Sequence, residues 1–310
     1  MFRGIQLVPP NTKIPFMAMH KACFVISTVI TVGTILLLIF KGLNLGIDFR
    51  GGILVEVRLP QAADLGAMRS TLGGLGLGEV GLQTFGAENE VLIRLEKQEG
   101  GEEAQQAAVA KIREALGEGA AYERVEVVGP QVSAELFRDG LIAMAAALFG
   151  IMVYVWFRFE WQFGVAAMIA DLHDVVATIG LFALLGLDFD LTSVAALLTI
   201  AGYSVNDTVV VFDRHRENLR KYKTMPLPQL FDLSINQTLS RTAITSVTAL
   251  LALLALYIFG GEVLRGFTIA LIFGIVFGTY SSIFIATPPL LYLNLRRGTV
   301  AEEQALAEAP

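Results

Sequence analysis

Residues 163–185 read FGVAAMIADLHDVVATIGLFALL, and this stretch decides the fold. At about 1.5 Å per residue, a helix of this length can cross a hydrocarbon core about 30 Å thick. The run nevertheless contains two aspartates, Asp171 and Asp174. Because an ionised side chain deep in a bilayer costs about 2.5–3.5 kcal/mol on insertion scales, such residues are rarely accidental. The stretch therefore predicts a membrane-spanning helix that has a function beyond anchoring.

Five further apolar runs of membrane-spanning length lie on either side of this one. The whole chain has 54% hydrophobic residues and a mean hydropathy of +0.61, which excludes a soluble domain of ordinary composition. Its formal charge of −6 gives no basic surface for nucleic acid. We therefore predict a polytopic α-helical membrane protein whose six spans cover 22–40, 140–158, 163–186, 190–213, 241–260 and 266–294.

Residues 41–139 have a different character, with frequent charges and no apolar run long enough to cross a membrane. Alternating apolar residues predict four strands, and two segments with helical periodicity lie between them. The predicted order is βαββαβ, which is that of an α+β ferredoxin-like domain. The strands are expected at 53–59, 80–85, 91–95 and 122–128, and the helices at 61–72 and 102–116.

The distribution of basic residues predicts the orientation. The strongest cluster follows the fourth span, in 214–240, where a loop and a short amphipathic helix are expected. With six spans, this loop lies on the same side as the N-terminal segment 1–21 and the tail 295–310. The positive-inside rule makes that side cytoplasmic. Both termini are then inside, and the domain 41–139 faces outward.

Polar residues at helical spacing mark three of the spans. Asp171 and Asp174 share one face of the third span. In the fourth and fifth spans the sequence singles out Thr199, Tyr203, Asn206, Asp207, Arg241, Thr245 and Thr248.

Asp207 and Arg241 lie near the same membrane boundary and could pair. An aspartate held by arginine gains a proton only if the pair separates or water enters, which would couple protonation to helix movement. The alternative is a static salt bridge that holds two helices together. For Asp171 and Asp174 the alternative is ordinary hydrogen bonding between helices.

Several motifs resemble a known family. They are GIDFRGG at 46–52, LHDV at 172–175, YSVNDTVVVFD at 203–213 with RHREN at 214–218, LSRT at 239–242 and FGIVFGTYSS at 273–282. Their order and their places on the spans are similar to those of the SecF family, the smaller subunits of the SecDF accessory complex of bacterial protein export.

The resemblance implies one six-helix half of a resistance-nodulation-division (RND) fold, the other half coming from a SecD-type subunit. It also implies a place in the bacterial inner membrane, a periplasmic domain at 41–139, and use of the proton gradient to promote preprotein translocation. Asp207 and Arg241 match the proton-coupling positions, and Asp213 and Arg214 match motif positions at the membrane exit. The implied partners are the SecYEG channel, the preprotein, YajC, YidC and, functionally, SecA.

We expect no enzymatic reaction, no cofactor and no metal site. One alternative is a half-transporter of RND type for lipids or drugs, although such proteins usually carry larger external domains. An intramembrane aspartyl protease is disfavoured because Asp174 and Asp207 lack the GxGD pattern of that class.

Overall fold

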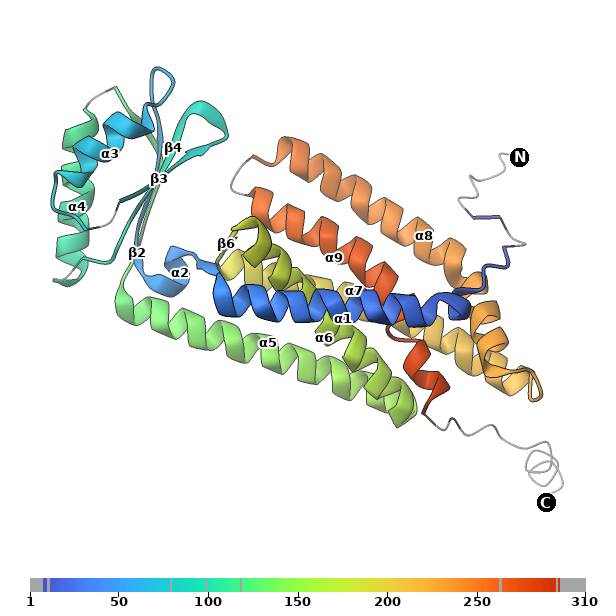
Figure 1. Cartoon of the computed structure of the whole chain (residues 1–310). Helices are drawn as coiled ribbons and strands as arrows, with labels where there is room; N and C mark the ends of the chain where they lie inside the picture. The colour runs from blue at the N-terminus through green and yellow to red at the C-terminus, as the bar shows by residue number, and fades with distance from the viewer. Residues whose placement is uncertain are drawn as a thin grey trace.

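The computed structural model describes residues 8–9, 12–78, 80–98, 100–117, 119–261, 264–293 and 295. It consists of a bundle of long helices and a smaller sheet domain at one end of the bundle (Figure 1). The start of the first helix and the turn that joins α7 to α8 both lie at the opposite end of the bundle, away from the sheet.

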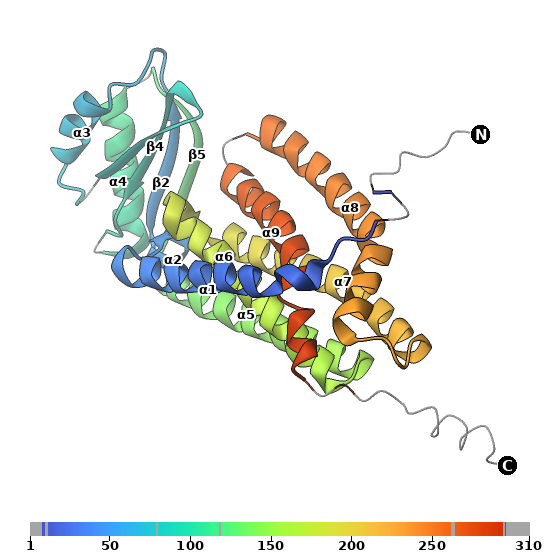
Figure 2. The ribbon, with the colours of Figure 1, turned by 45° about the vertical axis from the view of Figure 1, so that its right-hand side comes forward.

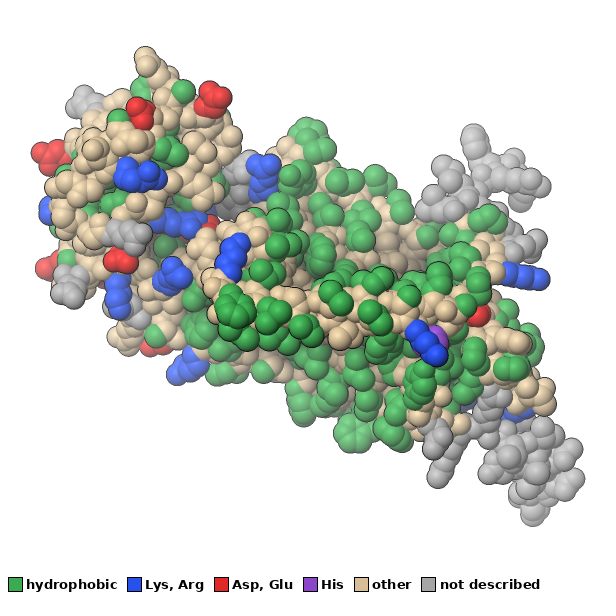
Figure 3. Space-filling model, viewed as in Figure 1, with side chains coloured by type: hydrophobic (Ala, Val, Ile, Leu, Met, Phe, Trp, Pro, Cys, Tyr) green, Lys and Arg blue, Asp and Glu red, His purple; other side chains and the backbone are tan. Residues whose placement is uncertain are grey.

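Six helices in the described part of the chain are long and apolar enough to cross a membrane. Their apolar side chains cover the side of the bundle seen in Figure 3, whereas charged side chains gather on the sheet domain. The prediction of six spans is confirmed. The helices are α1 Phe16–Phe40, α5 Pro130–Arg158, α6 Trp161–Leu185, α7 Leu191–Lys221, α8 Leu227–Phe259 and α9 Arg265–Phe284.

Three of the six helices form the inside of the bundle. In the most apolar window of α6, α7 and α9, 56% of the residues are buried, compared with 11% for α1, α5 and α8. The turned view of Figure 2 shows α7 behind α1 and between α6 and α8. Two of these buried helices carry the aspartates of the membrane-region motifs: α6 carries Asp174 and α7 carries Asp207.

The segments expected on the cytoplasmic side differ from the expectation in their extent. In place of a loop and a separate amphipathic helix over 214–240, α7 continues to Lys221, and α8 begins at Leu227 and runs unbroken to Phe259. One face of the first turns of α8 is buried, with Leu230, Phe231 and Ser234 on it, and Asn218 of α7 donates hydrogen bonds to Ser234 and Gln237.

The last span is also shorter than the predicted 266–294. Helix α9 ends at Phe284, and a 3₁₀ turn, η2, covers Pro288–Leu291. The pair Pro288-Pro289 accounts for the end of the helix, since proline has no backbone N–H to donate and disfavours helical backbone before it. Apart from residue 295, the expected tail 295–310 lies outside the described residues.

The sheet domain has the predicted βαββαβ order and confirms the ferredoxin-like expectation. Its four antiparallel strands lie in the order β3-β4-β2-β5. The elements are β2 Gly52–Arg58, α3 Leu65–Gly73, β3 Val80–Phe85, β4 Ala87–Leu95, α4 Gly101–Leu116 and β5 Ala121–Val128.

Alternation along the central strand explains this arrangement. Ile53, Val55 and Val57 point to one face, where they pack with buried residues of α3 and α4. Helix α3 begins at Leu65 rather than at the predicted residue 61, because the Asp64 side chain accepts hydrogen bonds from the backbone N–H groups of residues 66 and 67.

A short junction connects the sheet domain to the membrane helices. Helix α2, Ile47–Arg50, follows a two-residue strand β1, Asn44–Leu45, which pairs in parallel with β6, Asp188–Phe189, between α6 and α7. Gly52 then has a φ of +131°, and a Cβ there would lie 2.4 Å from the Leu95 carbonyl oxygen. This position therefore requires glycine, which explains the last glycine of the GIDFRGG motif.

Candidate functional site: a buried pair of carboxylates

Asp174 is fully buried in the middle of α6 and is held by hydroxyl groups. Its Oδ2 accepts hydrogen bonds from Ser204 Oγ of α7 at 2.6 Å and from Ser281 Oγ of α9 at 2.5 Å. Its Oδ1 lies 3.2 Å from His173 Nδ1, and the His173 ring stacks on Phe277. One carboxylate thus joins the three inner helices of the bundle.

Asp207, on α7, is buried in a similar way, with 7% of its surface exposed. Its Oδ1 accepts a hydrogen bond from Thr242 Oγ1 of α8 at 2.6 Å, and its Oδ2 accepts one from Ser282 Oγ of α9 at 2.8 Å. Both oxygens of this carboxylate are therefore bound by neutral hydroxyls from two neighbouring helices.

The two carboxylates share one turn of α9. Ser281 donates to Asp174 and Ser282 donates to Asp207. Adjacent residues of an α-helix point about 100° apart, so neighbouring serines can reach carboxylates on two different helices. Any rotation or shift of this turn changes the hydrogen bonds of both carboxylates together.

Arg241 lies near Asp207 without pairing with it. Helix α8 places Thr242 toward Asp207, whereas Arg241, one residue earlier, is exposed. Among the described residues Asp207 is in no ion pair, although it interacts electrostatically with Arg241 at longer range. The described residues therefore show no salt bridge between Asp207 and Arg241.

Most of the other predicted polar residues lie apart from the carboxylates. Thr199, Thr245 and Thr248 are exposed, and each hydroxyl bonds a carbonyl of its own helix. Asn206 is exposed as well. Tyr203 alone of this group takes part in contacts between helices: its hydroxyl lies 3.4 Å from Ser246 Oγ, which in turn is 2.8 Å from Thr279 Oγ1.

Asp171 and the motif residues at the end of α7 are also separate from this cluster. Asp171 is 3% exposed, and its Oδ1 has no hydrogen-bond partner in the described structure. It lines a cavity of about 210 Å³ between α5 and α6. Asp213 pairs with Arg158 of α5 at 2.8 Å, and Arg214 pairs with Glu217 at 3.0 Å.

Two glycines allow the close packing of α7 and α9 that brings these groups together. A Cβ on Gly274 would lie 2.4 Å from Ile200 Cγ1, and one on Gly278 would lie 3.3 Å from Ser204 Cβ. The GxxxG step formed by Gly274 and Gly278 therefore faces α7, as small residues do where membrane helices approach closely.

The outer end of α7 is capped from the junction. Asp48 Oδ2 accepts a hydrogen bond from the Leu191 N–H at 3.0 Å, beside the N-cap residue Asp190. Burial raises the pKa of Asp48, while the Leu191 hydrogen bond lowers it and the negative charge of Asp190 raises it further. The motif aspartate of GIDFRGG thus ties the junction below the sheet domain to the helix that carries Asp207.

Sequence reasoning identified both aspartates but missed their hydroxyl partners. Ser204, Thr242, Ser281 and Ser282 all lie within the quoted motifs, yet serine and threonine are common in membrane helices and carry little signal alone. The one feature of the sequence that could have identified these hydroxyl groups is that all four lie inside the quoted motifs. Within the described residues no group of three or more His, Cys, Asp or Glu side chains is placed to hold a metal ion.

This arrangement is suited to exchanging protons. A buried carboxylate that accepts hydrogen bonds from rotatable hydroxyls can be ionised, with both hydroxyls donating, or protonated, with one hydroxyl turned to accept. In this arrangement, the hydrogen bonds of Asp207 come from Thr242 of α8 and Ser282 of α9 and not from an arginine. A change of its protonation would therefore reorient hydroxyl groups on these two helices.

Comparisons with known proteins identify the chain's relatives. The profile described as "Protein export membrane protein SecD/SecF, C-terminal" matches residues 108–296, and that described as "SecD/SecF GG Motif" matches residues 36–63. The protein translocase subunit SecF of Cereibacter sphaeroides is 46% identical over 303 residues, covering 95% of this chain and 94% of that protein. The SecF of Rickettsia rickettsii is 46% identical over 94% of this chain and 95% of its own length.

This chain also matches part of the length of longer relatives. The protein translocase subunit SecDF of Brucella abortus is 44% identical over 99% of this chain and 41% of that protein. The crystal structure of SecDF from Thermus thermophilus, described as a translocon-associated membrane protein, is 35% identical. It superposes with a TM-score of 0.83 over 93% of this chain and 39% of that one.

Proposed function

The chain belongs to the SecD/SecF family of protein export membrane proteins, and we propose that it uses the proton gradient to promote preprotein translocation across the bacterial inner membrane. The fused SecDF relatives indicate a SecD-type partner that supplies the second half of the fold. In the proposed orientation both termini are cytoplasmic and the sheet domain is periplasmic. The protein then acts as a transport subunit and not as an enzyme.

The observation that carries the proposal is the environment of Asp207. This carboxylate is buried in a membrane helix, and its two hydrogen bonds come from hydroxyls rather than from cations. An ionised carboxylate without a countercharge is costly in a low-dielectric region, so a proton is its readiest source of compensation. A static structural pair would instead place Arg241 in contact with it.

In the proposed cycle Asp207 exchanges its proton as α8 and α9 move. When Asp207 is ionised, Arg241 is the nearest available cation on α8 and is drawn toward it; when Asp207 is protonated, Arg241 returns to its exposed position. Asp174 follows, because Ser281 and Ser282 are consecutive residues of α9. The movement would reach the external domain through α7, whose outer end is held by Asp48.

The proposed partners follow from this role. A SecD-type chain would complete the membrane domain, and the SecYEG channel would deliver the preprotein to the external domain. YajC, YidC and SecA belong to the same proposal as accessory or functional partners. Purification of the chain with a SecD-type subunit and SecYEG would support this assignment, and recovery as a homo-oligomer alone would favour an independent transporter of lipids or drugs.

The decisive experiment is proton-dependent preprotein export with Asp207→Asn, expressed at normal levels with its SecD-type partner. The variant keeps the size and most hydrogen bonds of the side chain but cannot exchange a proton, so export driven by the gradient should be lost. Asp139→Asn is a matched control, since it makes the same chemical change at an exposed aspartate in the third turn of α5. Undiminished export by Asp207→Asn would show that this carboxylate does not carry the coupling.

A further inference from the structure

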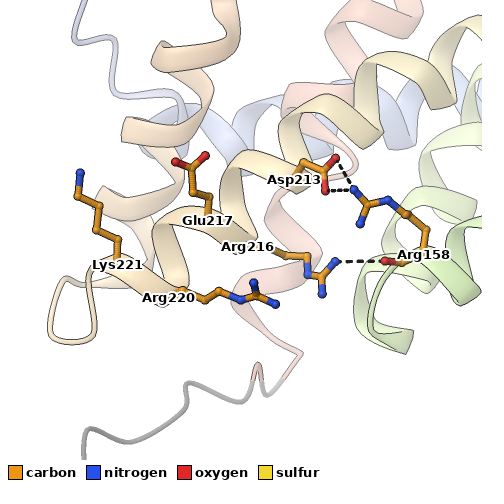
Figure 4. A pocket seen from close by; sticks show the side chains of 6 residues that line it. All are labelled: Arg158, Asp213, Arg216, Glu217, Arg220 and Lys221. Atoms are coloured by element: carbon orange, nitrogen blue, oxygen red, sulfur yellow. Dashed lines mark hydrogen bonds and ion pairs between the residues drawn. The ribbon is translucent and has the colours of Figure 1, made fainter. Parts of the chain in front are cut away.

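A basic pocket lies at the end of the bundle opposite the sheet domain. It has a volume of about 580 Å³ and lies between the last residue of α5 and the last turns of α7. Figure 4 shows Arg158 facing α7 across this space, with Arg216 and Arg220 reaching into it. The lining residues are Arg158, Asp213, Arg216, Glu217, Arg220 and Lys221.

The pocket has cations in excess once its ion pairs are accounted for. Arg158 is paired with Asp213, and Glu217 is paired with Arg214. Among the described residues, no carboxylate pairs with the three remaining cations of the lining. These are Arg216, Arg220 and Lys221.

Two of the guanidinium groups are already held in position. Those of Arg158 and Arg216 both lie against the ring of Phe159, at 5.0 and 5.4 Å from its centre. Arg216 also donates a hydrogen bond to the backbone carbonyl of Arg158 at 3.1 Å. Because these two side chains are already ordered, they lose less conformational entropy when an anion binds. Guanidinium groups presented in this way suit the oxygens of a phosphate ester.

Exposed aromatic residues place this pocket at the surface of the bilayer. Phe157 is 91% exposed and Trp156 63% exposed on α5, and Trp161 is 54% exposed at the start of α6. Tryptophan next to a basic cluster at the end of a span is typical of the level of the lipid headgroups. A phosphate bound between Arg216 and Arg220 would lie at that same level, with its acyl chains directed along α5.

We propose that this pocket binds the headgroup of an anionic phospholipid. The lipid phosphate lies between Arg216 and Arg220, and Arg158 and Lys221 complete the cationic wall. Basic pockets between membrane helices on the cytoplasmic side are suited to such headgroups. The bound lipid bridges the ends of α5 and α7, so it links a helix attached to the sheet domain with the helix that carries Asp207. The binding is independent of any proton coupling.

The two tryptophans of the chain, Trp156 and Trp161, can report on lipid near the pocket, because they lie two and three residues along the chain from the lining residue Arg158. The purified complex is reconstituted into phosphatidylcholine vesicles containing phosphatidylglycerol with brominated acyl chains. Control vesicles carry the same bromine content on phosphatidylcholine. The partner subunit's tryptophans are replaced by phenylalanine. Stronger quenching by brominated phosphatidylglycerol is expected, and it should weaken as salt is added.

The variants test the pocket itself. Arg216→Gln and Arg220→Gln should each reduce the preference for phosphatidylglycerol by about fivefold, since each removes one charge near an anionic lipid. Arg138→Gln, at the other end of α5, is the matched control and should keep the preference. Equal quenching by the two lipids in the unaltered protein, or an undiminished preference in the double variant, would refute the proposal. Loss of the preference on adding inorganic phosphate, but not on adding chloride at the same ionic strength, would assign the pocket to a free anion instead.

Discussion

Replacement of Gly274 by alanine tests whether the contact between α7 and α9 positions the carboxylates. The new Cβ would lie 2.4 Å from Cγ1, 2.5 Å from Cδ1 and 2.8 Å from Cγ2 of Ile200. All three distances are shorter than any normal carbon–carbon contact. Ile200 is 1% exposed, so it cannot turn out into the surroundings of the bundle. The Ile200 side chain, the two helices or both must therefore shift.

The expected magnitude follows from two opposing effects. Overpacking of this kind costs about 1–3 kcal/mol. Replacement of glycine by alanine inside a helix, taken alone, raises the free energy of unfolding by up to about 1 kcal/mol. We therefore expect Gly274→Ala to lower the free energy of unfolding by about 1–2 kcal/mol. Gly202→Ala on α7 is the matched control: nothing lies within 4 Å of its new Cβ, so it should leave stability unchanged or raise it.

The assay is equilibrium unfolding of the purified protein in mixed micelles, combined with proton-dependent export. Ile200→Ala removes the three atoms that the new Cβ would strike, and alone it should cost about 2–5 kcal/mol. The double variant should be more stable than the sum of the single effects by about 1–3 kcal/mol, because the clash is then absent. A gain in stability for Gly274→Ala equal to that of Gly202→Ala, or strict additivity in the double variant, would refute the reasoning.

Three further outcomes concern the external domain and its junction. Gly52→Ala should destabilise the sheet domain by about 1–3 kcal/mol, measured by protease susceptibility, because a side chain at a φ of +131° is strained and would strike Leu95. Burial raises the pKa of Asp48, so its contribution to stability is fully present below its ordinary value of 3.8 and is lost as the pH rises through the higher folded value. Asp48→Asn should remove that part of the pH dependence of thermal unfolding. Arg94→Gln breaks the ion pair with Asp188 and should speed hydrogen exchange at the β1–β6 pair while leaving the bundle unchanged.

The architecture of this protein was predictable because its signals are local and periodic. Runs of apolar residues identified all six spans, and the alternation of Ile53, Val55 and Val57 identified the central strand. The ends of the helices were harder to predict from the sequence. The continuation of α8 through 227–240 depends on contacts such as that between Asn218 and Ser234, which no local pattern contains.

In the site, likewise, the sequence identified individual residues, whereas the packing of the helices determines which residues are in contact. Asp174 and Asp207 were identifiable because a carboxylate in an apolar run is conspicuous. In this arrangement Thr242 rather than Arg241 donates a hydrogen bond to Asp207, and the coupling of Asp207 to Arg241 stays a prediction. A shift of one residue turns a helix by about 100°, and spacing along one helix does not fix its rotation against its neighbours.

Helix α7 explains how an event at a buried carboxylate could reach the external domain. Leu191 at its outer end donates its N–H to Asp48, which belongs to the junction, and Asp207 lies 16 residues further along the same helix. At helical rise this separates the two points by roughly 24 Å. Helices α8 and α9 contact Asp207 through single hydroxyls, whereas α7 joins both points through an unbroken backbone. A displacement of α7 that follows protonation of Asp207 therefore arrives at Asp48 without depending on any chain of side-chain contacts.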